Sequence, residues 1–482
     1  MQLQVIQRIL GLLLIVFSTT LLPPALISLL YNDGAWHTFI AAFLLLLTVG
    51  VVFWFPVKDY RKELRLRDGF LVVAMFWTVL GLAGALPLAL ASDPHLSLTD
   101  AVFESMSGLT TTGATVIVGL DTLPKSILFY RQELQWLGGM GIIVLAVAVL
   151  PMLGVGGMQL YRAETPGPMK DSKLTPRITE TAKALWYIYL SLTIACAVAY
   201  FLAGMTAFDA ICHSFSTVAI GGFSTHDASM GYFDSTAIEM IAVVFMLISG
   251  VNFALHYVAW RRRSLQTYRL DAEFRFYFGL LATVAIITST ALYYTDTYID
   301  DEAFYKGLFQ AVSIGTTTGF TTAEYYYWPP FIEILLLMSS FVGGCAGSTG
   351  GGMKAIRVLM LVKQGMREIT RLIHPSAHIP VRVGGKTLSP RVVDAVWGFF
   401  ALYVASFTFM YLALAATGLD LITSFSAVAA CMNNLGPGLG GVGASFAELG
   451  DLAKWILCFA MVLGRLEIFT LLVLITPGFW RS

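Results

Sequence analysis

Four short segments of this chain combine glycine with closely spaced backbone and hydroxyl oxygens, a pattern that suits the binding of a dehydrated cation. They are Thr111-Thr112-Gly113-Ala114, Ile220-Gly221-Gly222-Phe223, Thr317-Thr318-Gly319-Phe320 and Asn434-Leu435-Gly436-Pro437. A cation in a narrow pore loses its water, and backbone carbonyl oxygens replace that water without titrating. Carbonyls aligned toward one axis require backbone conformations that glycine adopts readily. The segments therefore predict a cation filter.

The predicted filter takes three residues from each segment. They are Thr111, Thr112, Gly113, Ile220, Gly221, Gly222, Thr317, Thr318, Gly319, Asn434, Leu435 and Gly436. The second and fourth segments lack the threonines of the other two, but coordination by carbonyl oxygens needs no particular side chain. The alternative is that the segments are turns at repeat boundaries with no part in conduction.

The spacing of the segments indicates an internal fourfold repeat. The central glycines Gly113, Gly222, Gly319 and Gly436 lie 109, 97 and 117 residues apart, close to a quarter of the 482-residue chain. About a dozen helix-compatible residues precede each glycine segment. A period of this length in an apolar chain predicts four modules around one axis.

Composition places the chain in a membrane. It is 57% hydrophobic and 12% charged, whereas soluble domains are about 25% charged. A soluble protein does not bury that much apolar surface, so we expect a polytopic membrane protein whose main surroundings are lipid. Lys plus Arg and Asp plus Glu balance at 30 each, so the net charge favours no acidic or basic partner, and no nucleic acid.

Runs of about 20 apolar residues, the length of one membrane span, occur ten times. We expect spans near 9–30, 38–57, 70–91, 133–153, 184–204, 236–258, 276–294, 331–362, 394–415 and 450–476. The first is long and lacks a small-residue cleavage site, so we interpret it as a retained helix and not a signal peptide.

Four shorter helical segments precede the glycines, near 100–111, 209–219, 304–316 and 420–432. Twelve helical residues rise only about 18 Å, which is too short for a hydrocarbon layer of about 30 Å. Each segment must therefore enter and leave on one side. Irregular backbone at that depth is tolerated only inside the protein or along a water-filled path.

The distribution of charge supports this topology. With a cytoplasmic N-terminus, the loops 58–68, 158–183, 260–275 and 354–391 face inward and hold 5, 5, 5 and 8 Lys or Arg residues. The outward segments hold only Lys125, Arg131 and Lys306, a positive-inside pattern that also puts the C-terminus in the cytoplasm. Fourteen Asp and Glu residues lie in the outward segments. They either concentrate cations at an outer mouth or are solvated loop charges.

The predicted fold class is therefore an all-α polytopic membrane protein with four pseudo-symmetric helix–pore-loop–helix repeats around one central pore. Two N-terminal transmembrane helices precede the repeats. The expected divisions are the N-terminal extension 1–69, repeat 1 at 70–183, repeat 2 at 184–275, repeat 3 at 276–393 and repeat 4 at 394–482.

Two features of the apolar segments break the fourfold equivalence and predict a gate. The first is the run Gly343, Gly344, Cys345, Ala346, Gly347, Ser348, Thr349, Gly350, Gly351 and Gly352, which interrupts an expected helix. Each glycine costs a helix up to about 1 kcal/mol relative to alanine, so we expect a mobile loop at membrane depth. Close helix packing through small residues is the alternative.

The second feature is Arg465, which lies 29 residues after Gly436 inside the last apolar span. The same offset from the second and third glycines reaches Val251, beside Asn252, and Ser348. These polar groups are expected to lie at one level beneath the filter. A buried Arg is costly unless it is paired or hydrated. We interpret it as a barrier or loop partner, with a structural ion pair as the alternative. Glu467, two residues later, would not face it on a helix.

Other residues that could carry chemistry have plainer explanations. The five cysteines lack metal-ligand spacing and are expected to be free buried thiols. Residues 383–387 (VGGKT) match the last residues of a phosphate-binding loop motif. However, Pro380 stands at the position of the first glycine of that motif, and we expect no strand before it. His213 is expected to pack or hydrogen-bond. No nucleophile, base and oxyanion set stands out, so we do not expect an enzyme.

The segments TTTGAT, AIGGFST, TTTGFTT and NNLGPGL, together with GGCAGSTGGGMK and GRLEIFTLLVLITPGFWR, resemble those of the Trk/Ktr/HKT superfamily of potassium transporters. The chain is most similar to the bacterial branch with two extra N-terminal helices, and the likeness covers nearly the whole chain. In this superfamily, glycine in all four filter segments accompanies potassium selectivity. The resemblance thus implies K+ at the filter residues, with Rb+ as a surrogate and no organic cofactor.

The resemblance also implies the gate and the partners. The glycine run 343–352 corresponds to the intramembrane gating loop of these transporters, and Arg465 to their arginine below the filter. Members form homodimers in the bacterial inner membrane and assemble with a cytosolic ring of nucleotide-binding regulatory subunits, TrkA in the Trk branch. The basic stretches 158–183 and 354–391 are either docking surfaces or connecting loops. A proton- or sodium-coupled symporter and a non-conducting sensor or scaffold remain the alternatives.

Overall fold

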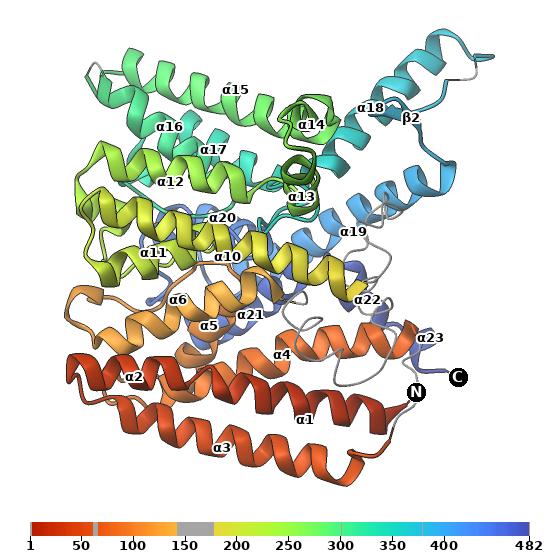
Figure 1. Cartoon of the computed structure of the whole chain (residues 1–482). Coiled ribbons are helices and arrows are strands. Elements are labelled where there is room, and N and C mark those ends of the chain that lie inside the picture. The colour runs from red at the N-terminus through yellow and green to blue at the C-terminus, as the bar shows by residue number, and fades with distance from the viewer. Residues whose placement is uncertain (1, 61–65, 142–177, 300, 378, 482) are drawn as a thin grey trace.

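The computed structural model describes residues 2–60, 66–141, 178–299, 301–377 and 379–481, and most of these residues are in helices (Figure 1). Within these residues, six helices are long and apolar enough to cross a membrane, or up to eight if each of two bent pairs is one span. The chain is therefore a multi-pass helical membrane protein. The six helices are Leu3–Tyr31, Trp36–Val57, Arg67–Leu90, Lys183–Leu202, Ala272–Tyr294 and Pro390–Ala415.

The N-terminal extension consists of α1 (Leu3–Thr19), α2 (Leu22–Tyr31) and α3 (Trp36–Trp54). Helices α1 and α2 form one span, in agreement with the apolar run expected at 9–30. A Cβ atom on Gly11 would lie 2.7 Å from the backbone nitrogen of Trp54. Glycine at this position therefore allows the backbones of α1 and α3 to approach each other closely.

The four predicted modules share the same order of elements. Each begins with a long helix: α4 (Leu66–Leu90), α10 (Ile178–Leu202), α15 (Ala272–Tyr294) and α19 (Pro390–Ala415). A short helix follows: α5 (Leu98–Leu109), α11 (Ala207–Ala219), α16 (Asp301–Gly315) and α20 (Leu421–Met432). After an irregular segment comes a closing helix: α6 (Lys125–Gly139), α12 (Thr236–Ser249), α17 (Pro330–Val342) and α21 (Asp451–Arg465). The short helices begin and end within three residues of the predicted positions.

Side-chain caps explain where three of the short helices begin. The side chains of Ser97, Thr206 and Asp420 accept hydrogen bonds from the backbone N–H groups three residues later, at 3.1, 3.1 and 3.0 Å. Such a cap satisfies an amide that has no partner within the helix. The short helices thus start at fixed residues, which sets the level at which their glycine ends lie.

Two closing helices that were predicted to be continuous, at 236–258 and 450–476, are broken. Helix α12 meets α13 (Phe253–Arg262) at 93°, and α21 meets α22 (Phe469–Ile475) at 117°. At the first bend, the Asn252 side chain accepts a hydrogen bond from the Ala254 amide at 2.8 Å and starts a new helix. At the second bend, Glu467 and Ile468 have φ angles of 52° and 62°, which a right-handed helix excludes.

The closing part of the third module is interrupted where the glycine run predicts a break. Helix α17 ends at Val342, and α18 (Ala355–Ile373) begins only after the run 343–352. The backbone between them is not helical, so close helix packing does not account for the glycines. In the first module, the predicted span 133–153 begins in α6, and its part beyond residue 141 lies outside the described residues, as does most of the loop 158–183.

The chain from α18 to α19 forms an arm that projects from the helical body (Figure 1). It holds a hairpin of β1 (Arg382–Val383) and β2 (Lys386–Thr387). Gly384 and Gly385 form its turn, with φ angles of 55° and 79°, so the residues that resemble a phosphate-binding loop are a hairpin tip. The remaining short elements are α14 (Gln266–Leu270), α23 (Pro477–Trp480), η1 (Phe55–Val57), η2 (Leu120–Thr122), η3 (Ser229–Phe233), η4 (Tyr325–Tyr327) and η5 (Gly440–Val442).

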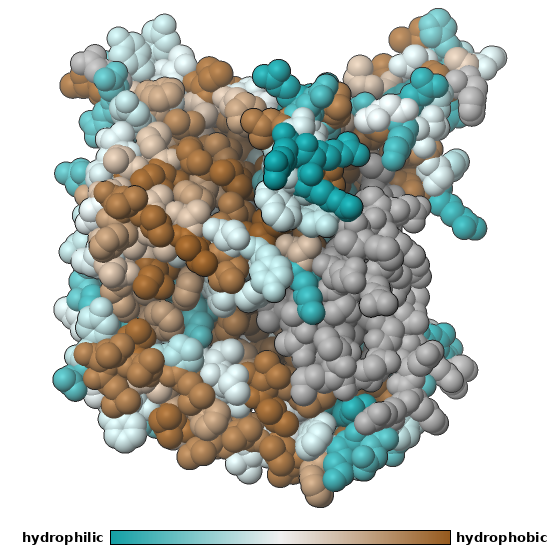
Figure 2. All heavy atoms as spheres, in the orientation of Figure 1, coloured by the Kyte–Doolittle hydropathy of each residue, from teal (hydrophilic) through white to brown (hydrophobic). Residues whose placement is uncertain are grey.

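The surface shown in Figure 2 is apolar across the helical body, and hydrophilic residues gather at its ends, including the region of α13 and α14. The residues Arg261, Arg262 and Arg263 are exposed there. Both termini lie on the side of the body that also holds α13, α14 and the α18 arm (Figure 1). This arrangement puts the described basic loops on one side, as the charge distribution predicts.

Candidate functional site

The four predicted glycines meet at one place, although they lie a quarter of the chain apart. A Cβ atom on Gly113 would lie 2.1 Å from the carbonyl oxygen of Gly221. One on Gly222 would lie 2.0 Å from the carbonyl oxygen of Thr318. Both distances are far shorter than any real Cβ contact, so only glycine fits at these positions.

The other two glycines complete a ring. A Cβ atom on Gly319 would lie 2.1 Å from the carbonyl oxygen of Leu435, and one on Gly436 would lie 2.7 Å from that of Thr112. Each glycine thus faces the carbonyl of the residue just before the next glycine, and the fourth segment returns to the first. The structure brings together all twelve residues predicted for the filter.

The turn into each glycine segment has the same backbone conformation in all four copies. The residue two positions before the glycine has a positive φ: 55° at Thr111, 55° at Ile220, 70° at Thr317 and 52° at Asn434. In each copy the next amide donates a 2.8 Å hydrogen bond back to the short helix, to the carbonyl oxygens of Ser107, Ser216, Ser313 and Ala430. This left-handed helix ending satisfies the last carbonyls of the helix.

The threonine hydroxyls of the first and third segments hold the turns together. The Thr110 and Thr112 hydroxyls lie 2.8 Å apart, as do those of Thr316 and Thr318. In the fourth segment, the Asn434 amide donates to the Thr112 hydroxyl at 2.9 Å and to the Met461 carbonyl at 3.0 Å. The hydroxyls therefore brace the backbone and link neighbouring segments.

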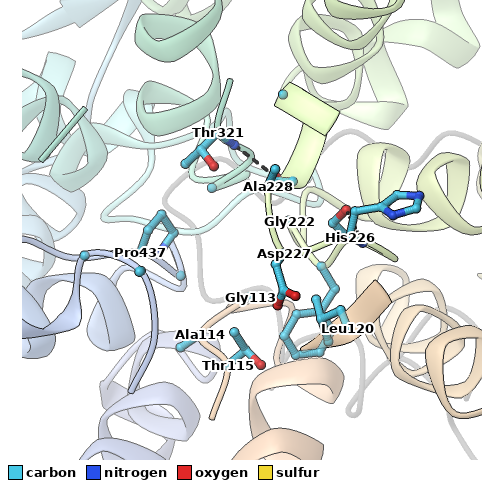
Figure 3. A pocket seen from close by; sticks show the side chains of 18 of the residues that line it. Gly113, Ala114, Thr115, Leu120, Gly222, His226, Asp227, Ala228, Thr321 and Pro437 are labelled. Carbon is cyan, nitrogen blue, oxygen red and sulfur yellow. Dashed lines mark hydrogen bonds between the residues drawn. The ribbon is translucent and has the colours of Figure 1, made fainter. Parts of the chain in front are cut away.

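A cavity of about 430 Å³ opens on one side of the glycine ring and is lined by all four glycines. Figure 3 shows Gly113, Gly222, Thr321 and Pro437 around this space, each from a different module. The Thr321 amide donates to the Ser229 hydroxyl at 3.2 Å and so ties the rims of the second and third modules together. Charged side chains, including Asp227 and Glu324, also line the cavity.

The acidic residues of the outward segments divide into two groups. Asp227 and Glu324 line the cavity, together with Arg131 and His226. Glu104 is fully buried, and Asp209 is 5% exposed, so these two carboxylates are not part of a solvated mouth. The Asp100 carboxylate pairs with the Lys454 ammonium at 2.6 Å and connects α5 to α21. Structural roles thus account for part of the acidic excess.

Glu104 and Arg131 form a fully buried ion pair beside the ring. The Arg131 Nε donates to the Glu104 carboxylate at 2.7 Å, and the two side chains are 1% and 0% exposed. The same carboxylate accepts hydrogen bonds from the Thr115 hydroxyl and from the Val116 amide, at 3.0 and 2.9 Å. The pair therefore fixes the chain just after Gly113. Sequence reasoning placed both residues in the outward segments but missed their pairing.

A histidine and two carboxylates form a cluster at the rim of the cavity. His226 hydrogen-bonds to Asp121, stacks on the Tyr232 ring at 3.4 Å between centroids, and lies 3.6 Å from the Asp209 carboxylate. Burial lowers the pKa of His226, but the neighbouring carboxylates of Asp209 and Asp121 outweigh burial and raise it above 6.5. Burial raises the pKa of Asp121, but the hydrogen bond from His226 outweighs this and lowers it. The ion pair is thus favoured near neutral pH.

His213 hydrogen-bonds inside the protein, as predicted. Its ring nitrogens lie 2.9 Å from the Asp209 carbonyl oxygen and 2.9 Å from the Ser224 hydroxyl. All five cysteines are free and buried. No group of three or more His, Cys, Asp or Glu side chains able to hold a metal occurs in the described part of the chain.

Arg465 lies on the other side of the ring from the cavity rim, where α21 ends. Its Nη1 donates to the Thr111 hydroxyl at 3.0 Å and to the Thr349 carbonyl at 3.1 Å, and its Nη2 donates to the Gly138 carbonyl at 2.7 Å. The guanidinium thus joins the first filter segment to the glycine run. Glu467, two residues later, forms an ion pair with Arg357.

The glycine run is packed directly against the filter turns. The Gly351 amide donates to the Thr317 hydroxyl at 2.7 Å, and the Gly352 amide donates to the Asn433 carbonyl at 3.0 Å. The Thr349 hydroxyl donates to the Val218 carbonyl at 3.0 Å. A Cβ atom on Gly351 would lie 2.0 Å from the Asn433 carbonyl oxygen. The run therefore touches the second, third and fourth modules next to the ring.

The predicted level beneath the filter is realised in part. A Cβ atom on Gly347 would lie 3.1 Å from the Asn252 side-chain oxygen, and the Phe253 amide donates to the Gly347 carbonyl at 3.0 Å. The bend after α12 thus meets the glycine run. The Arg465 guanidinium donates to the Thr349 carbonyl of the run, and the neighbouring Ser348 hydroxyl donates to the Cys345 carbonyl at 2.6 Å.

Glu273 also holds the glycine run, a contact that the sequence did not reveal. Its carboxylate accepts hydrogen bonds from the amides of Ala346 and Ile356, at 2.6 and 3.2 Å. The first amide lies inside the run and the second at the start of α18. One carboxylate at the start of α15 therefore ties the middle of the run to the start of α18.

Comparisons with known proteins agree with this architecture. A family model described as "TrkH: Cation transport protein" matches residues 36–480. The Trk system potassium uptake protein TrkH of Vibrio parahaemolyticus is 61% identical over 488 residues and covers 100% of both chains. The protein of the same name from Escherichia coli K12 is 55% identical, also over 100% of both. The crystal structure of the potassium transporter TrkH from Vibrio parahaemolyticus matches with a TM-score of 0.91, 59% identity and 100% coverage of both chains.

Proposed function

The chain belongs to the TrkH family of cation transport proteins, and on this premise we propose that it takes up potassium across the bacterial inner membrane. It is a transport protein and not an enzyme, as its family establishes. The relatives are named as potassium uptake proteins. Both termini would face the cytoplasm, because the basic loops lie on their side of the body. The inside-negative membrane potential would drive uptake.

The observation that carries this proposal is the closed ring of glycines and carbonyls. Four segments converge so tightly that each glycine faces a carbonyl oxygen of the next segment. Carbonyl oxygens in this arrangement replace the water of a K+ ion, and Rb+ would substitute for it. The twelve residues of the four segments would line the passage, with the threonine hydroxyls bracing the carbonyls.

Selectivity for potassium would depend on glycine in every copy of the repeat. A side chain at Gly113, for example, would collide with the Gly221 carbonyl at 2.1 Å and push it out of the ring. Displaced carbonyls would change both the number and the direction of the dipoles around the ion. A ring with glycine at all four positions keeps four equivalent carbonyls available.

The gate would consist of the glycine run 343–352 and Arg465. The run crowds the ring from one side, and Thr349 and Thr111 share the Arg465 guanidinium. A positive charge at this level would repel a cation that leaves the ring, and more strongly than in bulk water because the site is partly buried. Withdrawal of the run would break the contacts of Arg465 and open the path.

The cytosolic side would carry the regulatory partners. We propose that this chain forms a homodimer and that it binds a TrkA-like ring of nucleotide-binding subunits. The arm of α18 and its basic residues would lie on the cytosolic face, where the regulatory ring binds. The proposed organisation has ten spans and four re-entrant segments. It consists of the two-helix extension 1–69 and the repeats 70–183, 184–275, 276–393 and 394–482. The order of elements in the described modules supports this division.

Flux of rubidium into vesicles that contain the full chain tests the proposal. We expect Rb+ to enter and Na+ to be excluded, and a cytosolic nucleotide-binding partner to change the rate. Expression should also restore growth at low potassium to a bacterial strain without its own uptake systems. A chain that neither passes Rb+ nor restores growth would be a non-conducting scaffold, and the proposal would then fail. Acceleration of uptake by an imposed proton or sodium gradient would identify coupled transport.

A further inference from the structure

Three side chains of α6 hold the backbone of the second filter segment and of Ser224, which follows it, in the next module. The Gln135 amide donates to the Gly221 carbonyl at 2.6 Å, the Gln132 amide to the Phe223 carbonyl at 2.9 Å, and the Arg131 guanidinium to the Ser224 carbonyl at 3.1 Å. All three side chains are at most 1% exposed. Residues 131, 132 and 135 lie on one side of a helix, so α6 presents a row of donors to this segment.

Gln135 holds the segment on both sides of its central glycine. Its amide nitrogen donates to the Gly221 carbonyl, and its amide oxygen accepts a hydrogen bond from the Phe223 amide at 3.0 Å. Both terminal atoms of the side chain are therefore used, and Gly222 lies between the two groups that it holds. A side-chain amide with both ends engaged has one orientation, so it fixes the peptide groups that it contacts.

The close approach of Gln135 explains why this segment has two consecutive glycines. A Cβ atom on Gly221 would lie 2.4 Å from the Gln135 side-chain carbon. Gly222 leaves room for the neighbouring filter carbonyl, whereas Gly221 leaves room for the amide that orients its own carbonyl. The two glycines thus have different neighbours and different functions.

The other segments are held by different means. Threonine pairs brace the first and third segments, and Asn434 links the fourth segment to the first. The third segment has a glutamine of its own, but the amide of Gln310 is 3.4 Å from the Phe320 carbonyl, and its oxygen has no partner in the described part of the chain. The second segment, which lacks threonines before its glycine, depends on Gln135 instead.

We propose that Gln135, with Gln132 and Arg131 beside it, is the positioning residue that sets ion selectivity at the second filter segment. This inference rests on the proposed function, because it concerns the same ring of carbonyls. Gln135 does not touch the ion. It fixes the direction of the Gly221 carbonyl, which is the group that Gly113 faces. Without the donor, this carbonyl can turn, and the ring loses the geometry that excludes the smaller Na+ ion.

The test compares Rb+ and Na+ fluxes through the full chain in phospholipid vesicles. Gln135→Met keeps the side-chain length and removes both hydrogen bonds, and we expect the Rb+ to Na+ flux ratio to fall about three- to tenfold, the range for loss of one such bond. Gln135→Glu keeps an acceptor for the Phe223 amide but loses the donor to Gly221, so its ratio should fall as well. Gln266→Met, at an exposed glutamine of α14, is the control and should leave the ratio unchanged.

The flux ratio separates positioning from simple loss of stability. A variant that is merely less stable lowers both fluxes together and leaves their ratio intact, and size-exclusion chromatography reports how much folded protein remains. If Gln135→Met does not fold, the ratio of Gln135→Glu decides the question. If the wild type is selective and the folded Gln135 variants have the same Rb+ to Na+ flux ratio, the role of Gln135 is excluded while the proposed function stands. Absence of Rb+ flux in the wild type overturns the proposed function.

Discussion

Arg465 donates a hydrogen bond to the hydroxyl of Thr111 at 3.0 Å, which connects the end of the last closing helix to the first filter segment across 354 residues of sequence. The same guanidinium reaches the Thr349 carbonyl of the glycine run at 3.1 Å. A movement of the run would therefore change the hydrogen bonds of Arg465, and through them the contact between Arg465 and Thr111. This contact would give the proposed gate a physical link to the proposed filter.

Removal of this charge should raise basal flux. We expect Arg465→Ala to increase Rb+ flux without the cytosolic partner about tenfold, because loss of roughly 1.4 kcal/mol of barrier gives that factor. Deletion of residues 346–350 should act in the same direction. Arg465→Lys keeps the charge but loses the planar fork, so its flux should lie between those of Arg465→Ala and the wild type. Rb+ flux into vesicles measures the effect of all three changes. If Arg465→Ala and the deletion of 346–350 both showed the basal flux of the wild type, Arg465 and the run would not form a barrier.

Substitution in the ring should reduce selectivity. In Gly113→Ser, the new Cβ atom would start 2.1 Å from the Gly221 carbonyl oxygen and displace it. We expect the K+ to Na+ flux ratio to fall by about tenfold, which corresponds to roughly 1.4 kcal/mol of lost discrimination. Gly119→Ser is the control, because Gly119 has a similar φ of 79° but only one atom, at 3.9 Å, near its Cβ position. An unchanged ratio in folded Gly113→Ser would remove the filter assignment.

Release of the glycine run from α15 should also open the path. Glu273→Ala removes the acceptor for the amides of Ala346 and Ile356. The two amides are left without an acceptor, which weakens the closed loop by about 1 to 3 kcal/mol, so we expect basal Rb+ flux to rise. Glu302→Ala, an exposed acid in the first turn of α16, serves as the control. Equal basal flux in Glu273→Ala and wild type would argue against a role of this contact in gating.

Breaking the buried ion pair should destabilise the protein. Glu104→Gln leaves Arg131 charged and buried without its carboxylate, and loss of one partner of such a pair costs about 3 to 5 kcal/mol. Thermal unfolding of detergent-solubilised protein should show a clear fall in midpoint. In a double-mutant cycle with Arg131→Gln, the two effects should not add. Additive effects would mean that the two side chains act independently.

The rim cluster should make stability depend on pH. The pKa of His226 is raised, so its contribution is fully present below the ordinary histidine value of 6.5 and is lost as pH rises through the higher folded value. The pKa of Asp121 is lowered from 3.8, so its contribution is lost only at acidic pH below that value. His226→Gln should therefore lower the thermal midpoint more at pH 6 than at pH 9. An equal effect at both pH values would exclude the charged pair with Asp121 and Asp209.

Much of the framework was predictable because it depends on local composition. The apolar runs, the short helices and the glycines that follow them are encoded within windows of about 20 residues, and the observed helices agree with them. The interrupted third closing helix follows from six glycines in ten residues. The bends after Ser249 and Arg465 were missed, since the residues around them are as apolar as a continuous span and the breaks depend on a cap at Asn252 and on positive φ angles at Glu467 and Ile468.

The sequence by itself determined that this chain is a membrane protein, and it predicted four similar modules, each with a glycine where its short helix ends, because hydropathy and periodicity can be read from the order of the residues. Only the tertiary structure decided which module faces which, and with it the contacts of Gln135, Glu273 and Arg465. These side chains reach partners 73 to 354 residues away in the sequence. Partners at such distances leave no pattern in a single sequence, since their meeting depends on how whole helices pack around the common axis.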